Sequence, residues 1–224
     1  MEELITANVA TNLYWLGRNL KRANETLHKI SKAYDDIIDV DIDAGRKLYK
    51  TFNIELEYDG AVDFLQQAIL GEHSANILEL TANARESAII SRHRLDSDAF
   101  GEIIELHALF DSITKTDREI DYKLIDHAHS LISEIWGTFS KREHTNKSDL
   151  FIKMGKLVEE ADLRIRFNKD EAITVTVIEE IDAIVKVLSE DEEPVKQTQS
   201  QNSEENDLMG VVNTKINQVI IEEV

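Results

Sequence analysis

Charged side chains recur at helical spacing in separate segments of this 224-residue sequence. Trp15, Arg18 and Arg22 lie three and four residues apart, so a helix would carry them on one face. Arginines four residues apart repel each other mildly, and we therefore expect carboxylates from other helices to face them. The acids that the sequence offers for this purpose are Glu86, Glu159, Glu160 and Asp162.

A second basic face is predicted around Arg85 and Arg92, seven residues apart. A guanidinium group presents planar donors that suit a carboxylate or a phosphate. Two interpretations of these charges stay open: a salt-bridge network that fixes the register of the helices, or a charged cleft that holds a ligand. The residues proposed for this polar network or ligand site are Trp15, Arg18, Arg22, Arg85, Glu86, Arg92, Glu159, Glu160 and Asp162.

Two glycines within predicted helices mark a close approach. The run Leu16-Gly17-Arg18 to Asn24 has an echo in Met154-Gly155-Lys156 to Asp162, with an apolar residue, Gly and a basic residue at the start and Ala before Asn or Asp at the end. A glycine inside a helix costs about 1 kcal/mol relative to alanine. Two helices that cross at Gly17 and Gly155 would account for both glycines.

The sequence gives little support for a metal site or a cofactor site. Glu25 with His28 and Asp126 with His129 have the Glu-x-x-His type of spacing found in di-iron bundles, but both pairs flank the apolar stripes of their helices instead of lying on them. The chain has no cysteine, which excludes thiol nucleophiles, Cys-ligated zinc and iron–sulfur clusters. It also lacks glycine-rich phosphate loops and a Gly-x-Ser-x-Gly motif. We expect no catalytic residue, no metal and no cofactor.

The elements that must position these side chains are helices. Apolar residues recur at steps of three and four almost throughout, and one Pro and eight Gly are few for this length. We find no convincing strand before residue 190, so the fold class is all-α, a bundle of seven or eight helices. The first three predicted helices cover residues 9–37, residues 44–53 approximately, and a segment between Gly60 and Gly71. The fourth covers residues 75–94 and is capped by Ser74, the fifth is capped by Asp96 or Ser97, and the sixth follows a capping box at 116–119. After a loop at 141–148, the last two cover residues 151–165 and 173–188.

Composition divides the chain into a helical domain, residues 1–189, and two further segments. Residues 190–207 are acidic and polar and contain the only Pro, so we predict a disordered linker. Residues 208–224 are apolar again. This tail either frays or docks on a partner or a neighbouring subunit, because the linker would let it reach widely.

The charge balance limits the partners. With 25 Lys and Arg against 44 Asp and Glu, the chain has a formal net charge of −19. Such acidity opposes binding to nucleic acid and to anionic membrane surfaces. No apolar run is long enough to span a bilayer, and the N-terminus lacks the basic and apolar regions of a signal peptide. The default expectation is a cytoplasmic protein.

The charged motifs together resemble the alpha-E domain family, which is all-helical and takes its name from a Glu-Arg motif. The run Asn12-Leu13-Tyr14-Trp15-Leu16-Gly17-Arg18, followed by Lys21-Arg22-Ala23, is similar to the family's first motif. Ala84-Arg85-Glu86 with Arg92, and Gly155-Lys156 with Glu159-Glu160-Ala161-Asp162, follow in the order of the family's later motifs. The chain departs from the family where Lys21 replaces a Glu, Glu160 and Ile89 each replace an Arg, and Phe100 replaces a Trp. The exchange of charges at Lys21 and Glu160 suggests that the two motifs complement each other.

The resemblance implies a function only in outline. Alpha-E proteins are thought to work with ATP-grasp-type ligases and transglutaminase-like peptidases in systems that form or trim peptide-like amides. This implies a non-catalytic accessory or scaffold role with such a protein partner, and a homo-oligomer is compatible with it. The alternative is an enzyme or binding subunit that holds an anionic or zwitterionic small molecule among Arg22, Arg85, Glu86 and Arg92. Full pairing of these side chains would favour the scaffold, and unpaired donors around a void would favour the binding site.

Overall fold

A computed structural model of the chain describes residues 5–116, 120–141, 146–189, 210, 213 and 214. From residue 5 to 189 the described residues form eight α-helices and no strand, which confirms the all-α prediction. The helices are α1 (Ala7–Asp39), α2 (Ala44–Lys50), α3 (Ala61–Leu70), α4 (Ile77–Ile90), α5 (Ser97–Thr116), α6 (Tyr122–Lys141), α7 (Lys147–Arg166) and α8 (Glu171–Ser189), with a short 3₁₀ turn at Arg92–Arg94.

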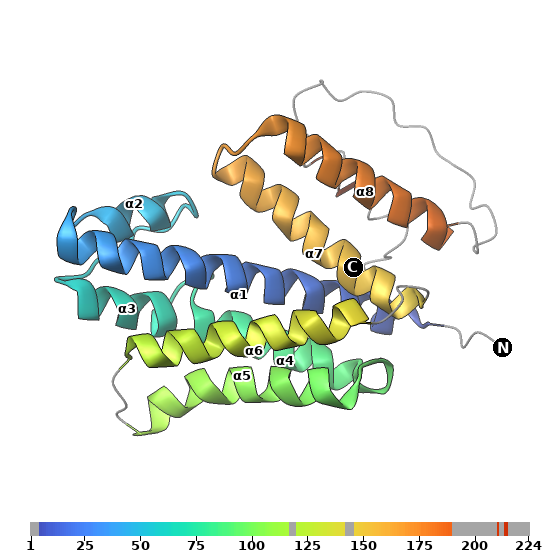
Figure 1. Cartoon of the computed structure of the whole chain (residues 1–224), viewed down its shortest axis with the longest axis horizontal. Coiled ribbons are helices and arrows are strands. Elements are labelled where there is room, and N and C mark those ends of the chain that lie inside the picture. The colour runs from blue at the N-terminus through green and yellow to red at the C-terminus, as the bar shows by residue number, and fades with distance from the viewer. Residues whose placement is uncertain (1–4, 117–119, 142–145, 190–209, 211–212, 215–224) are drawn as a thin grey trace.

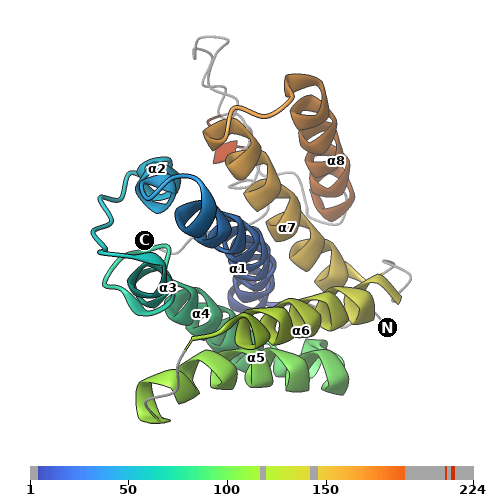
Figure 2. The same ribbon diagram turned by 60° about the vertical axis from the view of Figure 1, so that its left-hand side comes forward.

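The long helix α1 is the centre of the bundle (Figures 1 and 2). Most of its apolar seam is buried, because residues at steps of three and four face α7 on one side and α4 on the other, its two most extensive contacts. Helices α5 and α6 pack together beyond α4, while α8 packs on the outer side of α7. The short helices α2 and α3 pack near the C-terminal end of α1. The buried seam residues include Leu13, Leu16, Leu20, Leu27 and Ile30.

Two predicted helix caps are wrong, and helix α7 begins at Lys147, within the predicted loop at 141–148. Helix α4 is capped by Asn76 and not by Ser74: the Asn76 side chain accepts a hydrogen bond from the Glu79 N–H at 2.7 Å and donates one to the Glu79 carboxylate at 3.1 Å. This reciprocal pair satisfies the helix start better than a serine two residues earlier could. Helix α4 also ends at Ile90, four residues before the predicted end, and the chain continues as the 3₁₀ turn.

The predicted capping box at 116–119 is wrong in its first residue. Thr116 is the last residue of α5, and its hydroxyl donates to the Ser112 carbonyl at 2.7 Å. Helix α6 begins instead behind Asp121, whose carboxylate accepts from the Leu124 N–H at 2.9 Å. A carboxylate is as good a cap as a threonine hydroxyl and also suits the positive end of the helix dipole. Residues 117–119 are outside the described part of the chain.

The predicted linker at 190–207 and most of the predicted tail at 208–224 also lie outside the described residues. Gly210, Asn213 and Thr214 are described and have helical backbone. Within the described residues, no helix combines the length and the apolar composition that a bilayer-spanning segment needs.

Candidate functional site

Helices α1 and α7 touch at the two predicted glycines. A Cβ atom on Gly17 would lie 2.1 Å from the carbonyl oxygen of Ile152, and one on Gly155 would lie 2.0 Å from that of Tyr14. Only hydrogen atoms fit between two backbones at such a distance. The crossing predicted from the sequence echo is confirmed, and it fixes which side chains meet just beyond it.

One turn from the crossing, Glu159 of α7 binds two arginines of α1. Its side chain is 0% exposed, and its two oxygens accept hydrogen bonds from four N–H groups. Arg18 donates from Nε and Nη2 to Oε2 at 3.0 and 2.9 Å. Arg22 donates from Nε to Oε1 at 2.5 Å and from Nη2 to Oε2 at 2.9 Å. The carboxylate is therefore buried but fully engaged by two permanent cations.

Aromatic rings complete the surroundings of Arg18. Its guanidinium carbon lies 5.0 Å from the centre of the Trp15 ring and 5.9 Å from that of Tyr14. Burial by itself lowers the pKa of Arg18, but the charges of Tyr14 and Glu159 and the hydrogen bonds to Glu159 outweigh it, so the pKa is raised above its ordinary value. This guanidinium stays charged and cannot serve as an acid or a base.

A second layer of charges surrounds this pair. Asp162 accepts a hydrogen bond from Arg166 at 2.9 Å and lies 3.9 Å from Arg22. Glu160 lies 3.3 Å from Arg164 and 3.4 Å from Lys21. Sequence reasoning missed the two arginines of α7, although each follows its acid by four residues, a spacing that favours ion pairs on a helix.

The predicted exchange of charges between the two motifs is visible at this interface. Lys21 and Glu160, the two positions predicted to have exchanged charges, are ion-pair partners at 3.4 Å. Their neighbours Arg22 and Glu159 form the shorter pair beside them. The basic charge of one motif is thus compensated by the acidic charge of the other.

Exchanging these two charges tests that compensation. Lys21→Glu alone, or Glu160→Arg alone, is expected to lower the free energy of unfolding by roughly 0.5–1 kcal/mol, because each places like charges side by side at a partly exposed position. The double variant is expected to lose less stability than the sum of the two single losses, although the pairs of Lys21 with Glu25 and of Glu160 with Arg164 stay broken in it. Urea denaturation of the four proteins measures the coupling, and additive losses in the double variant would show that the pair does not interact.

The remaining predicted site residues do not join this cluster. Arg85 forms an ion pair with its neighbour Glu86 on an exposed part of α4. The exposed Arg92 lies over the ring of Phe100, with 4.9 Å between the guanidinium carbon and the ring centre. The structure therefore brings together Trp15, Arg18, Arg22, Glu159, Glu160 and Asp162, and places Arg85, Glu86 and Arg92 on α4 and the turn that follows it.

The space beside the network is small. A cavity of about 90 Å³ is bordered by Arg22, Ser74, Glu159, Asp162 and Arg166, among others. Substrate pockets usually measure roughly 300–1,000 Å³, so this one has room for a few water molecules only.

Arg22→Ala tests whether the network is structural. We expect the free energy of unfolding to fall by roughly 1–3 kcal/mol, because the buried Glu159 loses one partner but keeps Arg18. Thermal and urea denaturation measure the loss. A change of only a few tenths of a kcal/mol would mean that water replaces Arg22 at the carboxylate.

The histidines of the two candidate metal motifs contact each other through their rings. His28 of α1 and His129 of α6 stack on each other, with ring centres 4.1 Å apart and planes 20° from parallel. Glu25 forms an ion pair with Lys21 instead of joining them. Within the described ranges, no group of three His, Asp or Glu side chains is arranged to hold a metal ion.

This stacked pair predicts a dependence of stability on pH. Burial, and then the neighbouring His28, lower the pKa of His129. A histidine with a lowered folded pKa contributes stability above its unfolded pKa, and this is lost as the pH falls through the folded value. We expect His129→Phe, which keeps the ring stack, to reduce the drop in melting temperature between about pH 7.5 and pH 5.

His93→Gln, which replaces an exposed histidine on the 3₁₀ turn, is the matched control for the loss of an imidazole ring. His73 and His107 also have pKa values lowered chiefly by burial, so His129→Phe removes only part of the drop. An unchanged pH profile in His129→Phe would contradict the assignment.

Comparison with known proteins gives one match. The model of a family called Alpha-E, described as a predicted alpha-helical domain with a conserved ER motif, matches residues 5–212. The match covers nearly the whole chain and continues past the domain boundary predicted at residue 189. No curated protein and no solved structure matches the chain.

Proposed function

The chain belongs to the Alpha-E family, and from this membership we propose that it is a non-catalytic accessory or scaffold protein of the cytoplasm that engages a protein partner. The observation that carries the proposal is the closed network at the α1–α7 crossing. Glu159 is buried and its oxygens are occupied by Arg18 and Arg22, so these charges hold two helices in register. None of them is left to bind or activate a substrate.

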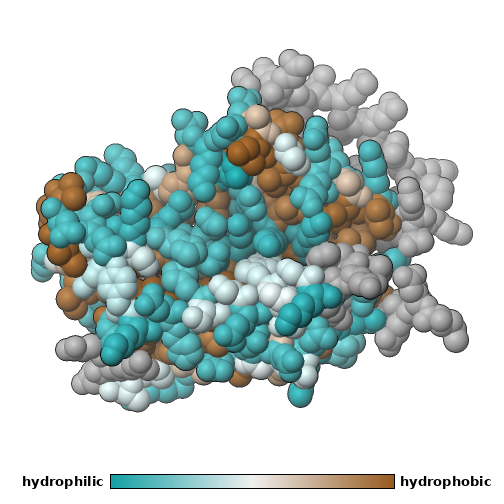
Figure 3. Space-filling model, viewed as in Figure 1, coloured by the Kyte–Doolittle hydropathy of each residue, from teal (hydrophilic) through white to brown (hydrophobic). Residues whose placement is uncertain are grey.

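The surface that we propose for the partner is at the C-terminal end of α1. Three large apolar side chains are exposed there within five residues, namely Ile38, Val40 and Ile42, and Val40 is 81% exposed. Figure 3 shows hydrophobic surface at this end of the molecule, on the left of the view. Exposed apolar side chains gathered in one place with polar neighbours are typical of protein interaction sites. We call these three residues the α1-end patch.

The charges around the α1-end patch indicate the character of the partner. Five aspartates lie between residues 35 and 43, interleaved with the apolar residues. A matching surface would have an apolar centre and a basic rim, because complementary charge steers association and excludes wrong partners. The family resemblance implies an ATP-grasp-type ligase or a transglutaminase-like peptidase as this partner. The acidic surface opposes nucleic acid and anionic membranes.

The test uses the purified full chain and the purified ligase and peptidase of the same organism. Size-exclusion chromatography with light scattering is expected to show a complex with one of them that Val40→Asp abolishes. Val187→Asp is the matched control, since Val187 is also an exposed valine, at 52%, but lies on α8. Absence of a complex with either protein, or an unchanged complex with Val40→Asp, would contradict the proposal.

The alternative function, a small-molecule cleft lined by Arg22, Arg85, Glu86 and Arg92, has weaker support. Arg22 is bound to Glu159, and Arg85 and Glu86 pair with each other elsewhere. Hydrolysis or formation of a peptide-like amide by the chain alone would nevertheless contradict the scaffold.

A further inference from the structure

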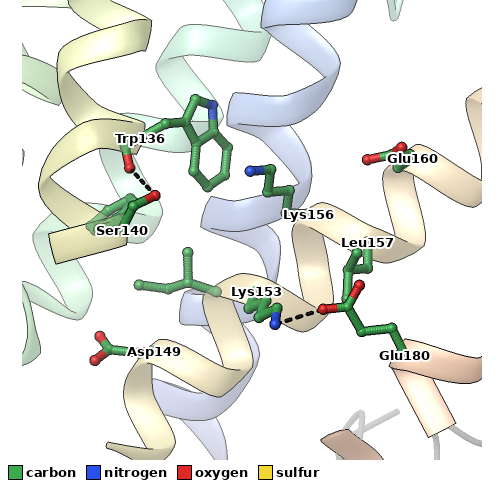
Figure 4. Close-up of a pocket in the computed structure, with 10 residues that line it drawn as sticks. Trp136, Ser140, Asp149, Lys153, Lys156, Leu157, Glu160 and Glu180 are labelled. Atoms are coloured by element: carbon green, nitrogen blue, oxygen red, sulfur yellow. Dashed lines mark hydrogen bonds and ion pairs between the residues drawn. The ribbon is translucent and has the colours of Figure 1, made fainter. Parts of the chain in front are cut away.

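A partly enclosed cavity lies between α6, α7 and α8, on the side of α7 that carries Lys153, Lys156 and Glu160 (Figure 4). Its volume is about 230 Å³. A cavity of roughly 150 Å³ holds one benzene molecule, so this one has room for an aromatic ring with a short side arm. Its wall is apolar at Phe139, Ile152 and Leu157 and aromatic at Trp136.

Three of the charged side chains on this wall, Lys153, Glu160 and Glu180, are in ion pairs. Lys153 and Glu180 form an ion pair at 2.6 Å, drawn as a dashed line in Figure 4. Glu160 lies within ion-pair distance of Arg164 and Lys21. Within the part of the chain that the structure describes, no carboxylate lies within ion-pair distance of Lys156.

Lys156 is held in place without being neutralised. Its ammonium nitrogen lies 4.4 Å from the centre of the Trp136 ring, toward which it points in Figure 4. A cation over an indole face is attracted by the negative charge density of the ring. That contact orients the ammonium group at the cavity wall but leaves it without a counter-ion. A half-buried cation without a counter-ion is costly, and an anion bound beside it would remove that cost.

We propose that this cavity binds a carboxylate attached to an apolar or aromatic group, with the carboxylate on Lys156 and the apolar group against Trp136, Ile152 and Leu157. The source of the carboxylate is either a small organic acid or the C-terminus of a peptide. An ammonium group binds both through the same contact, and the small volume limits the group beside the carboxylate to about one aromatic side chain. This site is separate from the α1-end patch and goes beyond the scaffold function.

The electrostatics of Lys156 predict how binding depends on pH. Burial lowers its pKa most, and the positive charges of Lys21 on α1 and Lys153 on α7 lower it further. Glu160 on α7 and Glu180 on α8 counteract this in part. Asp149 also borders the cavity, whereas α6 contributes only uncharged side chains. A bound carboxylate would raise the pKa of Lys156, so binding is coupled to proton uptake and weakens as the pH rises through the pKa of the free lysine.

Isothermal titration calorimetry of the full chain with 3-phenylpropanoate tests the site. The acid is expected to bind with a dissociation constant below about 10 mM, as its size allows. The neutral analogue 3-phenylpropan-1-ol should bind at least tenfold more weakly, because it keeps the phenyl ring but has no carboxylate, and so no negative charge, to pair with Lys156. This comparison uses the unchanged protein and does not depend on the folding of a variant.

Two lysine variants locate the carboxylate. Lys156→Met keeps most of the length of the side chain but removes its charge, and should weaken binding of the acid at least tenfold. Lys153→Met is the matched control, since Lys153 borders the same cavity but is paired with Glu180, and it should change binding less than threefold. The affinity for the unchanged protein should fall with rising pH, and Lys156→Met should not show this dependence.

A second pair of probes distinguishes the two sources. The tripeptide Ala-Ala-Phe with a free C-terminus, compared with its C-terminal amide, reports on peptide binding. Tighter binding of the free peptide than of 3-phenylpropanoate assigns the site to a peptide terminus, and the reverse assigns it to a small acid. Equal binding of acid and alcohol, no binding of any probe, or unchanged binding in Lys156→Met would overturn the proposal.

Discussion

Glu159→Ala is expected to lower the free energy of unfolding by roughly 3–5 kcal/mol, the largest effect that we expect from removing a single charge in this protein. Glu159 is fully buried and accepts hydrogen bonds from both Arg18 and Arg22. Without it, two arginines remain at the helix crossing, with side chains only 14% and 29% exposed. Their mutual repulsion and lost solvation then act against the packing of α1 on α7.

Urea denaturation measures this loss, and two further variants provide the comparison. Glu180→Ala removes an acid from a partly exposed ion pair on α8 and should cost no more than about 1 kcal/mol. The triple variant Arg18→Met/Arg22→Met/Glu159→Leu removes all three charges together. It should recover a large part of the stability, because the cost comes from stranding the arginines and not from the absence of the ions. A loss in Glu159→Ala as small as that in Glu180→Ala would show that water reaches the network.

Adding one methyl group at the helix crossing is expected to have an effect of similar size. Gly155→Ala places a Cβ 2.0 Å from the backbone oxygen of Tyr14, and Gly17→Ala places one 2.1 Å from that of Ile152. Backbone atoms cannot rotate away as a side chain can, so the helices must separate. We expect each variant to lose at least about 2 kcal/mol of unfolding free energy, although alanine is the better helix former by about 1 kcal/mol.

The protein contains matched controls for this experiment. Gly101 of α5 and Gly137 of α6 are also helical, and a Cβ on either would meet nothing within 4 Å. Gly101→Ala and Gly137→Ala should therefore raise stability by up to about 1 kcal/mol. If the variants at Gly17 and Gly155 lose stability while those at Gly101 and Gly137 gain it, the loss is due to the close approach of the helices and not to helix propensity. Stabilisation by Gly155→Ala would contradict the crossing.

Separation of the helices should also disturb the charge network. Glu159 follows Gly155 by four residues, one turn along α7, and Arg18 directly follows Gly17 on α1. A shift at the glycines therefore moves the carboxylate away from its arginines. The losses in Gly155→Ala and Glu159→Ala should accordingly be less than additive when combined, because both disturb the same interface.

The helices themselves could be predicted because their signals are local. The apolar residues of α1 repeat every three or four positions, and Gly60 and Gly71 flank α3 as the punctuation suggested. The caps were harder to predict, since Ser74, Asn76, Thr116 and Asp121 are all acceptable cap residues. Which of them caps a helix depends on where the first helical turn forms in the folded chain.

The sequence by itself determined an all-helical fold, the contact between Gly17 and Gly155, and the meeting of Arg22 with the acids of α7, because the two related motifs carry spacings and charges that fit each other. Only the tertiary structure decided what Arg85 and Lys156 do. Arg85 directly follows the buried Ala84 on α4, but successive residues of a helix point in different directions. Arg85 therefore pairs with Glu86 on an exposed part of α4, away from the α1–α7 crossing. Lys156 borders a cavity because α6 and α8 pack on either side of it, and no spacing within one segment shows which distant helices will enclose a side chain.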